Sequence, residues 1–261
     1  MSLVTVNISF NEGCIESERQ ALFMFKQDLI NHANRLASWT VDKDCCDWVG
    51  VVCDNVTGHV LQLHLTNPLS SPGNLYARDA DYEAFERLSL CCQSPMVVWS
   101  FLELYLSGCQ LPQVPPPENL NLSSLTILDL SSNSLENTLV DFSWIFQLKS
   151  LVSLDLSGNN FQGCVFDGLE NMTSLTHLDL SDNSFNSSIP DWLYKLNSLQ
   201  FLSLRFNYLQ GLISSAVGNM SSAISLDFSG NELEGKIPRS MGNLCNLKSI
   251  DYSVGVNFLV N

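Results

Sequence analysis

The sequence is short of basic residues and contains no long hydrophobic run. Among its 261 residues, 12 Lys and Arg stand against 27 Asp and Glu, which gives a formal net charge of −15. Such a charge repels a nucleic-acid backbone or an anionic membrane surface at long range, so nucleic acid is not expected as a partner. No apolar run approaches the roughly 18 to 20 residues that span a bilayer, so this chain is expected to have no membrane span.

Catalytic motifs are also missing. The sequence has no G-x-S-x-G elbow, no H-E-x-x-H pair, no phosphate-binding loop and no protein-kinase signature. Its four histidines, His32, His59, His64 and His177, do not stand near a cysteine or serine in a recognisable catalytic arrangement. We therefore expect neither an enzyme nor a cofactor.

Nine cysteines and six N-x-S/T sequons favour the secretory route. Nine is odd, so at least one cysteine is unpaired or pairs outside the chain. The sequons, candidate glycosylation sites, are Asn7, Asn55, Asn121, Asn171, Asn186 and Asn219. Three of them share one phase of the repeat described next, and recurring acceptors beside clustered cysteines are typical of secreted proteins. Residues 1–13 lack a basic leader and an apolar block, so we expect a remnant of a signal or a disordered leader.

Internal repetition decides the fold class. The template L-x-x-L-x-L-x-x-N/C-x-L fits from Phe101, Leu125, Leu151, Leu175, Leu199 and Ala223. In this template the L-x-L core predicts a short strand whose apolar side chains point inward and whose middle residue faces the concave side. One repeat cannot bury its own apolar face, so the repeats must stack. The sequence predicts an α/β leucine-rich-repeat solenoid with a curved parallel sheet.

Partial repeats flank the six repeats that fit the template. In front, Val60, Leu63 and Leu65 fit the template, although Pro68 occupies the Asn position, and at the back the chain stops inside a repeat without a cysteine-bearing cap. After the Asn, several repeats carry fragments of x-G-x-I-P, as at Gly235 to Pro238. These fragments resemble the plant-specific subtype of the repeat, in which this segment forms a second short strand.

Residues 14–58 do not repeat and predict a cap. The stretch "CIESERQALFMFKQDL" starts with a capping box, Ser17 followed by Gln20, and places Leu22, Phe25 and Leu29 at helical spacing. It predicts an amphipathic helix that covers the end of the solenoid. The stretch "DCCDWVGVVCDNVTGHVLQLHL" then supplies three cysteines and runs into the first strand.

This cap resembles the N-terminal caps of plant leucine-rich-repeat receptor-like proteins, in particular the group of receptors for fungal ethylene-inducing xylanase. Four stretches carry the resemblance: the two quoted above and, in addition, "NRLASW" and "GNLCNL". It implies a cap with two disulfides, Cys14 to Cys45 and Cys46 to Cys53. A metal site of Cys45, Cys46, Cys53 and His59 is disfavoured, because adjacent cysteines suit two disulfides better than one tetrahedral ion.

The expected organisation has five parts. They are the leader 1–13, the cap 14–58, a first degenerate repeat 59–68, an irregular insertion 69–100 and the repeats 101–261, whose C-terminal end is uncapped. The insertion is either a helical loop or the scar of a lost block of repeats. The pairing of Cys91, Cys92 and Cys109 is left open, whereas Cys164 and Cys245 are expected to be lone thiols, since neither has a second cysteine nearby in sequence.

The residues between the two strand leucines form what we call the acidic column. It consists of Tyr105, Asp129, Asp155, Asp179, Ser203, Asp227 and Asp251. Neighbouring carboxylates on strands about 4.8 Å apart repel each other by about 1 kcal/mol in water. Either these aspartates are solvated or bond the adjacent serines, Ser131, Ser157, Ser181 and Ser229, or the column favours a cationic ligand.

The repeat 199–211 interrupts this column. Ser203 removes a negative charge, Arg205 adds a positive one, and Phe201 and Phe206 place aromatic rings at outward positions, with Tyr208 just beyond. Aromatics and Arg are enriched in interface hot spots. Alternatively, Phe206 packs against the next repeat and Arg205 pairs with Asp179 or Asp227. The candidate ligand-binding residues are His177, Asp179, Phe201, Ser203, Arg205, Phe206 and Asp227.

The resemblance implies a function. The chain would be the extracellular recognition module of a plant receptor-like protein, which binds a microbial, peptide or protein ligand in defence or development. A full-length relative would sit in the plasma membrane and signal through a co-receptor or adaptor kinase, while this chain would lie in the apoplast. Two alternatives are a secreted protein like the polygalacturonase inhibitors and a truncated receptor fragment without a function of its own.

Overall fold

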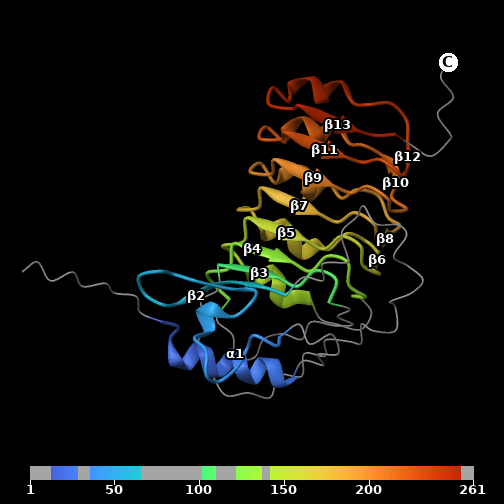
Figure 1. The fold of residues 1–261 in the computed structure, drawn as a ribbon. Helices are drawn as coiled ribbons and strands as arrows, with labels where there is room; N and C mark the ends of the chain where they lie inside the picture. Colours follow the sequence, from blue (N-terminus) through green and yellow to red (C-terminus); the bar gives the residue numbers. More distant parts are fainter. Residues whose placement is uncertain (1–12, 29–35, 66–101, 110–121, 137–141, 254–261) are drawn as a thin grey trace, which may run out of the picture.

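The protein is a curved stack of coils, each of which adds one strand to a common sheet (Figure 1). The computed structural model describes residues 13–28, 36–65, 102–109, 122–136 and 142–253. The sheet has nine strands: β1 (Val51–Cys53), β2 (Val60–His64), β3 (Glu103–Tyr105), β4 (Ile127–Asp129), β5 (Ser153–Asp155), β7 (His177–Asp179), β9 (Phe201–Ser203), β11 (Ser225–Asp227) and β13 (Ser249–Asp251). From β2 to β13 the pairing is parallel and in sequence order, whereas β1 is antiparallel to β2.

The strands form where the repeat places one apolar residue between two outward ones. In β4 and β5 the central residues Leu128 and Leu154 are buried and pair in register, while the residues on either side of each are half-buried. Stacking therefore turns one apolar position per repeat into a continuous core. The predicted leucine-rich-repeat solenoid is confirmed.

A ladder of buried asparagines joins successive coils from Asn133 to Asn231. The Asn159 Nδ2 donates to the backbone oxygens of Leu130 and Leu156, both at 3.0 Å, and its Oδ1 accepts from the Leu135 N–H at 3.1 Å. Asn183, Asn207 and Asn231 repeat this pattern. In the Cys109 repeat the Sγ donates to the Leu65 oxygen instead, at 3.0 Å. Each amide thus satisfies backbone groups of two coils that would otherwise be buried without partners.

A second set of short strands follows the asparagines. Here β6 (Gln162–Gly163) pairs with β8 (Ser184–Phe185), and β10 (Gln210–Leu212) pairs with β12 (Glu232–Glu234), both in parallel. The glycines of the x-G-x-I-P fragments have positive φ, 77° at Gly163, 79° at Gly211 and 82° at Gly235, which side chains rarely adopt. The second strands that the resemblance implied are therefore present, but they include only Gly163 and Gly211 of these glycines, since β12 ends just before Gly235.

Short 3-10 helices complete the coils. They are η3 (Phe142–Gln147), η4 (Asp167–Asn171), η5 (Asp191–Lys195), η6 (Ser215–Asn219) and η7 (Arg239–Asn243). Successive members contact one another from coil to coil. Each places buried apolar side chains against the core, such as Leu169 in η4 and Val217 in η6.

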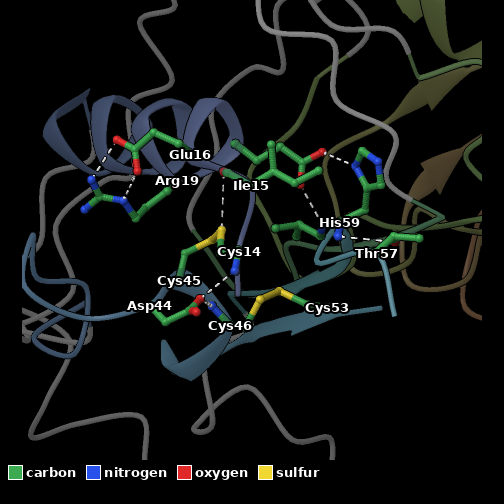
Figure 2. Close-up of a disulfide and its surroundings, with 12 residues drawn as sticks. Cys14, Ile15, Glu16, Arg19, Asp44, Cys45, Cys46, Cys53, Thr57 and His59 are labelled. Atoms are coloured by element: carbon green, nitrogen blue, oxygen red, sulfur yellow. Dashed lines mark hydrogen bonds and ion pairs between the residues drawn. A yellow bond between two sulfur atoms is a disulfide. The ribbon is translucent and has the colours of Figure 1, made fainter. Parts of the chain in front are cut away.

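The cap consists of helix α1 (Glu16–Asp28), the short helix η1 (Cys45–Asp47) and strand β1. Two disulfides tie it together, Cys14 to Cys45 and Cys46 to Cys53, as the resemblance implied (Figure 2). The buried rings of Trp39 and Trp48 stack with centroids 5.1 Å apart, and the ring centroid of Phe23 in α1 lies 6.5 Å from that of Trp48.

The start of the cap helix differs from the predicted one. Helix α1 begins at Glu16, which places Ser17 inside the first turn rather than at the N-cap. Gln20 Nε2 donates to the Glu16 carboxylate, which also pairs with Arg19 (Figure 2). Acidic side chains at a helix N-terminus are favoured by the helix dipole, so Glu16 stabilises the first turn in place of the predicted capping box.

Several predictions fall outside the described residues. They concern residues 1–12 of the leader, Leu29, Pro68, the insertion 69–100 with Cys91 and Cys92, and the sequons at Asn7 and Asn121. Cys164 and Cys245 are exposed thiols that take part in no disulfide.

Candidate ligand-binding surface on the concave sheet

The acidic column is a line of neighbouring side chains on the outward face of the sheet. Parallel register places Asp129 beside Asp155, Asp155 beside Asp179, Asp179 beside Ser203, and Ser203 beside Asp227. Ser203 therefore divides the column into two acidic stretches.

The aspartates of the column bond to their own strand ends. Each Oδ1 accepts from the backbone N–H of the serine two residues later, at 2.9 Å for Asp129 and Asp155 and 2.8 Å for Asp179. The same turn occurs at Asp227 and at Asp251. The partner common to all of them is thus the serine backbone. The Ser229 hydroxyl also donates to Asp227 at 2.6 Å, and side-chain hydrogen bonds from Ser157 and Ser253 act on Asp155 and Asp251. These carboxylates have a structural role, and Ser203 has replaced one of them.

Asp155 carries an electrostatic cost. Burial raises its pKa from 3.8 to about 6, against the hydrogen bonds from Ser157, and the neighbouring charges of Asp179 and Asp129 add to the rise. The centre of the column is therefore a place where one carboxylate is readily protonated or neutralised by a cation.

Two aromatic rings lie on the strands beside the break in the column. His177 of β7 and Phe201 of β9 are register partners, and their rings stack with centroids 4.2 Å apart. Burial lowers the pKa of His177, which favours the neutral imidazole. The pair therefore presents a flat and largely uncharged surface next to Ser203.

Arg205 and Phe206 form a stacked pair in the turn after β9. The Arg205 Cζ lies 4.4 Å from the centroid of the Phe206 ring, within the range of a cation–π interaction. Phe206 has a φ of 50° and remains 51% exposed. Its ring lies against Gly230 of the next coil, where an added Cβ would overlap it. Phe206 thus packs against the next repeat, as one alternative expected, and still faces solvent.

The other half of that alternative is wrong. Within the described residues, Arg205 makes no ion pair with Asp179 or Asp227 and its guanidinium donates no hydrogen bond. Its charge is felt at Asp251, whose pKa is lowered first by the bonds from Ser253 and to a smaller extent by Arg205. The guanidinium is therefore held by stacking and keeps its hydrogen-bond donors available.

All seven candidate residues lie on three neighbouring coils. His177 and Asp179 are on β7, Phe201 and Ser203 on β9, Asp227 is on β11, and Arg205 and Phe206 follow β9. Gly230 also belongs to this surface, because it lies 24 residues after Phe206 and makes room for its ring. Its distance from Phe206 in the sequence, one repeat length, is the signal that could have identified it.

The cap holds the densest group of metal-binding atom types among the described residues. Ligand atoms of Cys14, Asp44, Cys45 and Cys46 lie within 4.8 Å of one another. The three sulfurs belong to disulfides, however, and Asp44 Oδ1 accepts from the backbone N–H groups of Cys14 and Cys46, both at 2.9 Å (Figure 2). The group fastens the start of the chain to η1 and offers no thiolate ligand.

Comparison with known families defines the class of protein. The leucine rich repeat N-terminal domain model matches residues 15–54, and leucine rich repeat models match residues 124–148, 150–172, 166–209 and 222–244. The chain is thus a leucine-rich-repeat protein with an N-terminal cap domain of the same class. Among the described residues, no helix combines the length and apolar character that a membrane crossing requires.

The chain is related to the plant receptor-like proteins EIX1 and EIX2. It is 34% identical to tomato (Solanum lycopersicum) EIX2 over 150 residues, which cover 58% of this chain and 12% of EIX2. It is 32% identical to tomato EIX1 over 195 residues, which cover 62% of this chain and 18% of EIX1. It therefore spans a small part of the length of these relatives. They form a non-catalytic family of the secretory pathway and the cell exterior.

Solved plant ectodomains share the fold. The Arabidopsis thaliana GASSHO1/SCHENGEN3 ectodomain, in complex with CASPARIAN STRIP INTEGRITY FACTOR 2, matches with a TM-score of 0.66 and 28% identity, over 90% of this chain and 27% of that one. Arabidopsis HAESA, in complex with the peptide hormone IDA and the co-receptor SERK1, gives 0.66 and 29%, over 92% and 42%. A plant ice-binding protein gives 0.68 and 26%, over 93% and 72%.

Proposed function

We propose that the chain is the extracellular recognition module of a plant receptor-like protein and binds a peptide or protein ligand on its concave face. The ligand would lie across β7, β9 and β11 and contact the seven candidate residues. In a full-length receptor the bound ligand would recruit a co-receptor or adaptor kinase, in defence or developmental signalling. The kinship with receptor-like proteins supports this role, as do the ligands named for the similar ectodomains.

The observation that carries the proposal is the Arg205 and Phe206 pair. An Arg that is stacked, exposed and without an ion pair loses little side-chain entropy when it forms a hydrogen bond, because its position is already fixed. Asp179 and Asp227 lie on the strands at either side of β9. The coil between the two aspartates thus carries a cationic group, and the His177 and Phe201 rings lie two residues before Asp179 and Ser203 on β7 and β9.

This arrangement favours a ligand with an extended backbone and mixed charge. An acidic group would contact Arg205, while basic groups would lie over the aspartates on either side. Complementary charges of this kind set orientation and suppress wrong partners more than they raise affinity. Apolar side chains of the ligand would rest on Phe201 and Phe206.

A peptide-display selection tests the proposal without a known ligand. A random-sequence library is selected on the wild-type chain, and the dissociation constants of the enriched peptides are measured for the R205A/F206A variant. We expect a loss of at least about tenfold, since hot-spot residues contribute about 2 kcal/mol or more each. Arg239→Ala in η7 is the matched control, because Arg239 is an exposed Arg away from the sheet.

Equal binding of the enriched peptides to wild type and R205A/F206A would remove this surface from the proposal. A direct inhibition assay against fungal polygalacturonase distinguishes the receptor module from the alternative, a secreted inhibitor. Inhibition by the wild-type chain that survives R205A/F206A would identify an inhibitor that uses another surface.

A further inference from the structure

Asn186 and Tyr208 are direct neighbours on the side of the solenoid that carries the second strands. The Tyr208 N–H donates to the Phe185 oxygen at 2.9 Å, and the Gln210 N–H donates to the Ser187 oxygen at 3.0 Å. Ser188 and Gln210 form a parallel bridge, and the same register two residues earlier places Asn186 opposite Tyr208. Adjacent strands are about 4.8 Å apart, and opposite residues point to the same face.

Both side chains face solvent. Asn186 is exposed, and Tyr208 is 55% exposed. Within the described residues the Tyr208 ring stacks on no other ring and its hydroxyl makes no hydrogen bond. A large aromatic ring therefore lies uncovered beside Asn186. A tyrosine ring is amphipathic, so it suits a partner that is apolar on one side and polar on the other.

Asn186 is the acceptor of the sequon Asn186-Ser187-Ser188. In the secretory pathway the Asn186 amide nitrogen attacks C1 of the first N-acetylglucosamine of a lipid-linked oligosaccharide diphosphate. The C1–N bond forms, the C1–O bond breaks, the lipid diphosphate leaves with the electron pair, and the amide nitrogen gives up one proton to a base. The product carries its first sugar on the residue opposite Tyr208.

We propose that Asn186 carries an N-glycan whose first N-acetylglucosamine packs against the ring of Tyr208. The C–H groups of a pyranose ring are weakly positive and the face of an aromatic ring is negative, so the two faces attract each other. The sugar removes apolar surface from water, while its hydroxyls remain solvated. Tyr208 is thus a carbohydrate platform, and it is separate from the ligand surface of Arg205 and Phe206.

The sequon at Asn219 is a natural control because it has no such platform. Asn219 is the last residue of η6, and the corresponding last residues of η5 and η7 are Lys195 and Asn243. Neither neighbour is aromatic. A glycan on Asn219 is therefore expected to project into solvent without a ring to pack on.

The test is a double-mutant cycle on the full chain, secreted from plant cells. Ser188→Ala removes the sequon and keeps Asn186, Tyr208→Ala removes the platform, and Tyr208→Phe keeps the ring. Glycopeptide mass spectrometry measures occupancy, and thermal unfolding measures the midpoint. We expect loss of the glycan to lower the midpoint by about 2 °C in the wild-type and Tyr208→Phe backgrounds and to have no effect in Tyr208→Ala. Ser221→Ala, which removes the Asn219 sequon, should behave identically with and without Tyr208.

A second measurement does not depend on unfolding. Endoglycosidase trimming to a single N-acetylglucosamine leaves one acetyl methyl at Asn186, and its proton resonance should shift upfield from the ring current of Tyr208. The shift should disappear in Tyr208→Ala. An unoccupied Asn186, an equal midpoint loss in Tyr208→Ala, or an unshifted acetyl resonance overturns the proposal. None of these outcomes bears on the proposed ligand-binding function, which is tested separately by peptide binding.

Discussion

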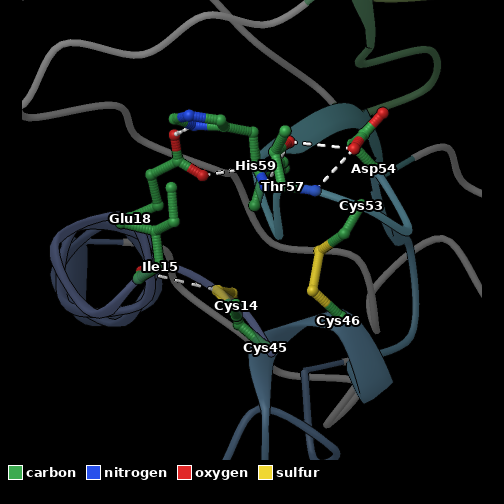
Figure 3. A network of polar contacts seen from close by, with 10 residues as sticks. Cys14, Ile15, Glu18, Cys45, Cys46, Cys53, Asp54, Thr57 and His59 are labelled. Carbon is green, nitrogen blue, oxygen red and sulfur yellow. Dashed lines mark hydrogen bonds and ion pairs between the residues drawn. A yellow bond between two sulfur atoms is a disulfide. The ribbon is translucent and has the colours of Figure 1, made fainter. Parts of the chain in front are cut away.

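The carboxylate of Glu18, in the cap helix, accepts a hydrogen bond of 2.7 Å from the backbone N–H of Val60, the first residue of β2. Its other oxygen contacts the His59 Nδ1 at 2.9 Å (Figure 3). Glu18 is 3% exposed. A buried carboxylate thus joins the cap to the first coil of the solenoid, where the N–H of Val60 would otherwise have no partner.

Glu18→Ala is expected to loosen the cap. Leaving a buried N–H unsatisfied costs about 1 to 3 kcal/mol. Hydrogen exchange of the Val60 amide should therefore accelerate by at least about tenfold. Glu18→Gln keeps an oxygen for Val60 and should retain most of the protection, and Ser17→Ala, at an exposed position of the same helix, should leave the exchange of the Val60 amide unchanged. Unchanged exchange in Glu18→Ala would show that the bond does not hold the cap in place.

Asn183→Ala is expected to destabilise its coil and the coil before it. Asn183 Nδ2 bonds the Leu156 and Leu180 oxygens, and its Oδ1 bonds the Phe161 N–H. These buried groups lose their partners together, so we expect a loss of about 2 to 4 kcal/mol in the free energy of unfolding. Chemical denaturation measures it, with the exposed Asn160→Ala as the control. A loss equal to that of Asn160→Ala would contradict the ladder's role.

Asp155→Asn is expected to stabilise the chain near neutral pH. The folded chain raises the Asp155 pKa from 3.8 to about 6, so it binds this proton more tightly than the unfolded chain does. Folding takes up a proton in this window, and the contribution of Asp155 to stability falls as pH rises through it. The Asn variant lacks this penalty and can still accept from Ser157. Its unfolding midpoint should exceed that of wild type at pH 7 and approach it near pH 4, whereas a constant difference would contradict the raised pKa.

Gly230→Ala is expected to displace Phe206. Gly230 has a φ of 66°, and a methyl group there would overlap the Phe206 ring. Backbone strain alone should cost about 1 kcal/mol, as at Gly158, which has a φ of 63° but meets only Ser132. The excess cost over Gly158→Ala should disappear in the Phe206→Ala background. Thermal unfolding of the four variants measures this coupling, and additive losses would show that the ring does not depend on Gly230.

The sequence predicts the solenoid well because burial repeats with the chain. Each leucine and asparagine of the template has the same surroundings in every coil, so the pattern alone assigns its role. The Glu18 bond to Val60 escapes prediction because it joins residues 42 positions apart that meet only after the cap has docked. Strand β1 escapes prediction for a different reason: it lies outside the repeat, and its antiparallel pairing depends on the turn that joins it to β2.

The candidate surface was predicted as a set of positions but not as a geometry. The period of two places Phe201 and Ser203 on the outward face. It does not show that Phe201 stacks on His177, or that Arg205 lies over Phe206 rather than on an aspartate. These contacts depend on side-chain conformations and on Gly230 in the next coil. A pattern within one repeat predicts neither of them.

The most direct test of the account is photocrosslinking of a display-selected peptide. A photoreactive phenylalanine analogue is placed at Ser203, the centre of the candidate surface, or at Glu234, an exposed residue of β12 on the second sheet. The account predicts that the bound peptide crosslinks from position 203 and not from position 234, and that Arg205→Ala reduces the yield. Crosslinking from position 234 alone would show that the ligand binds elsewhere on the solenoid.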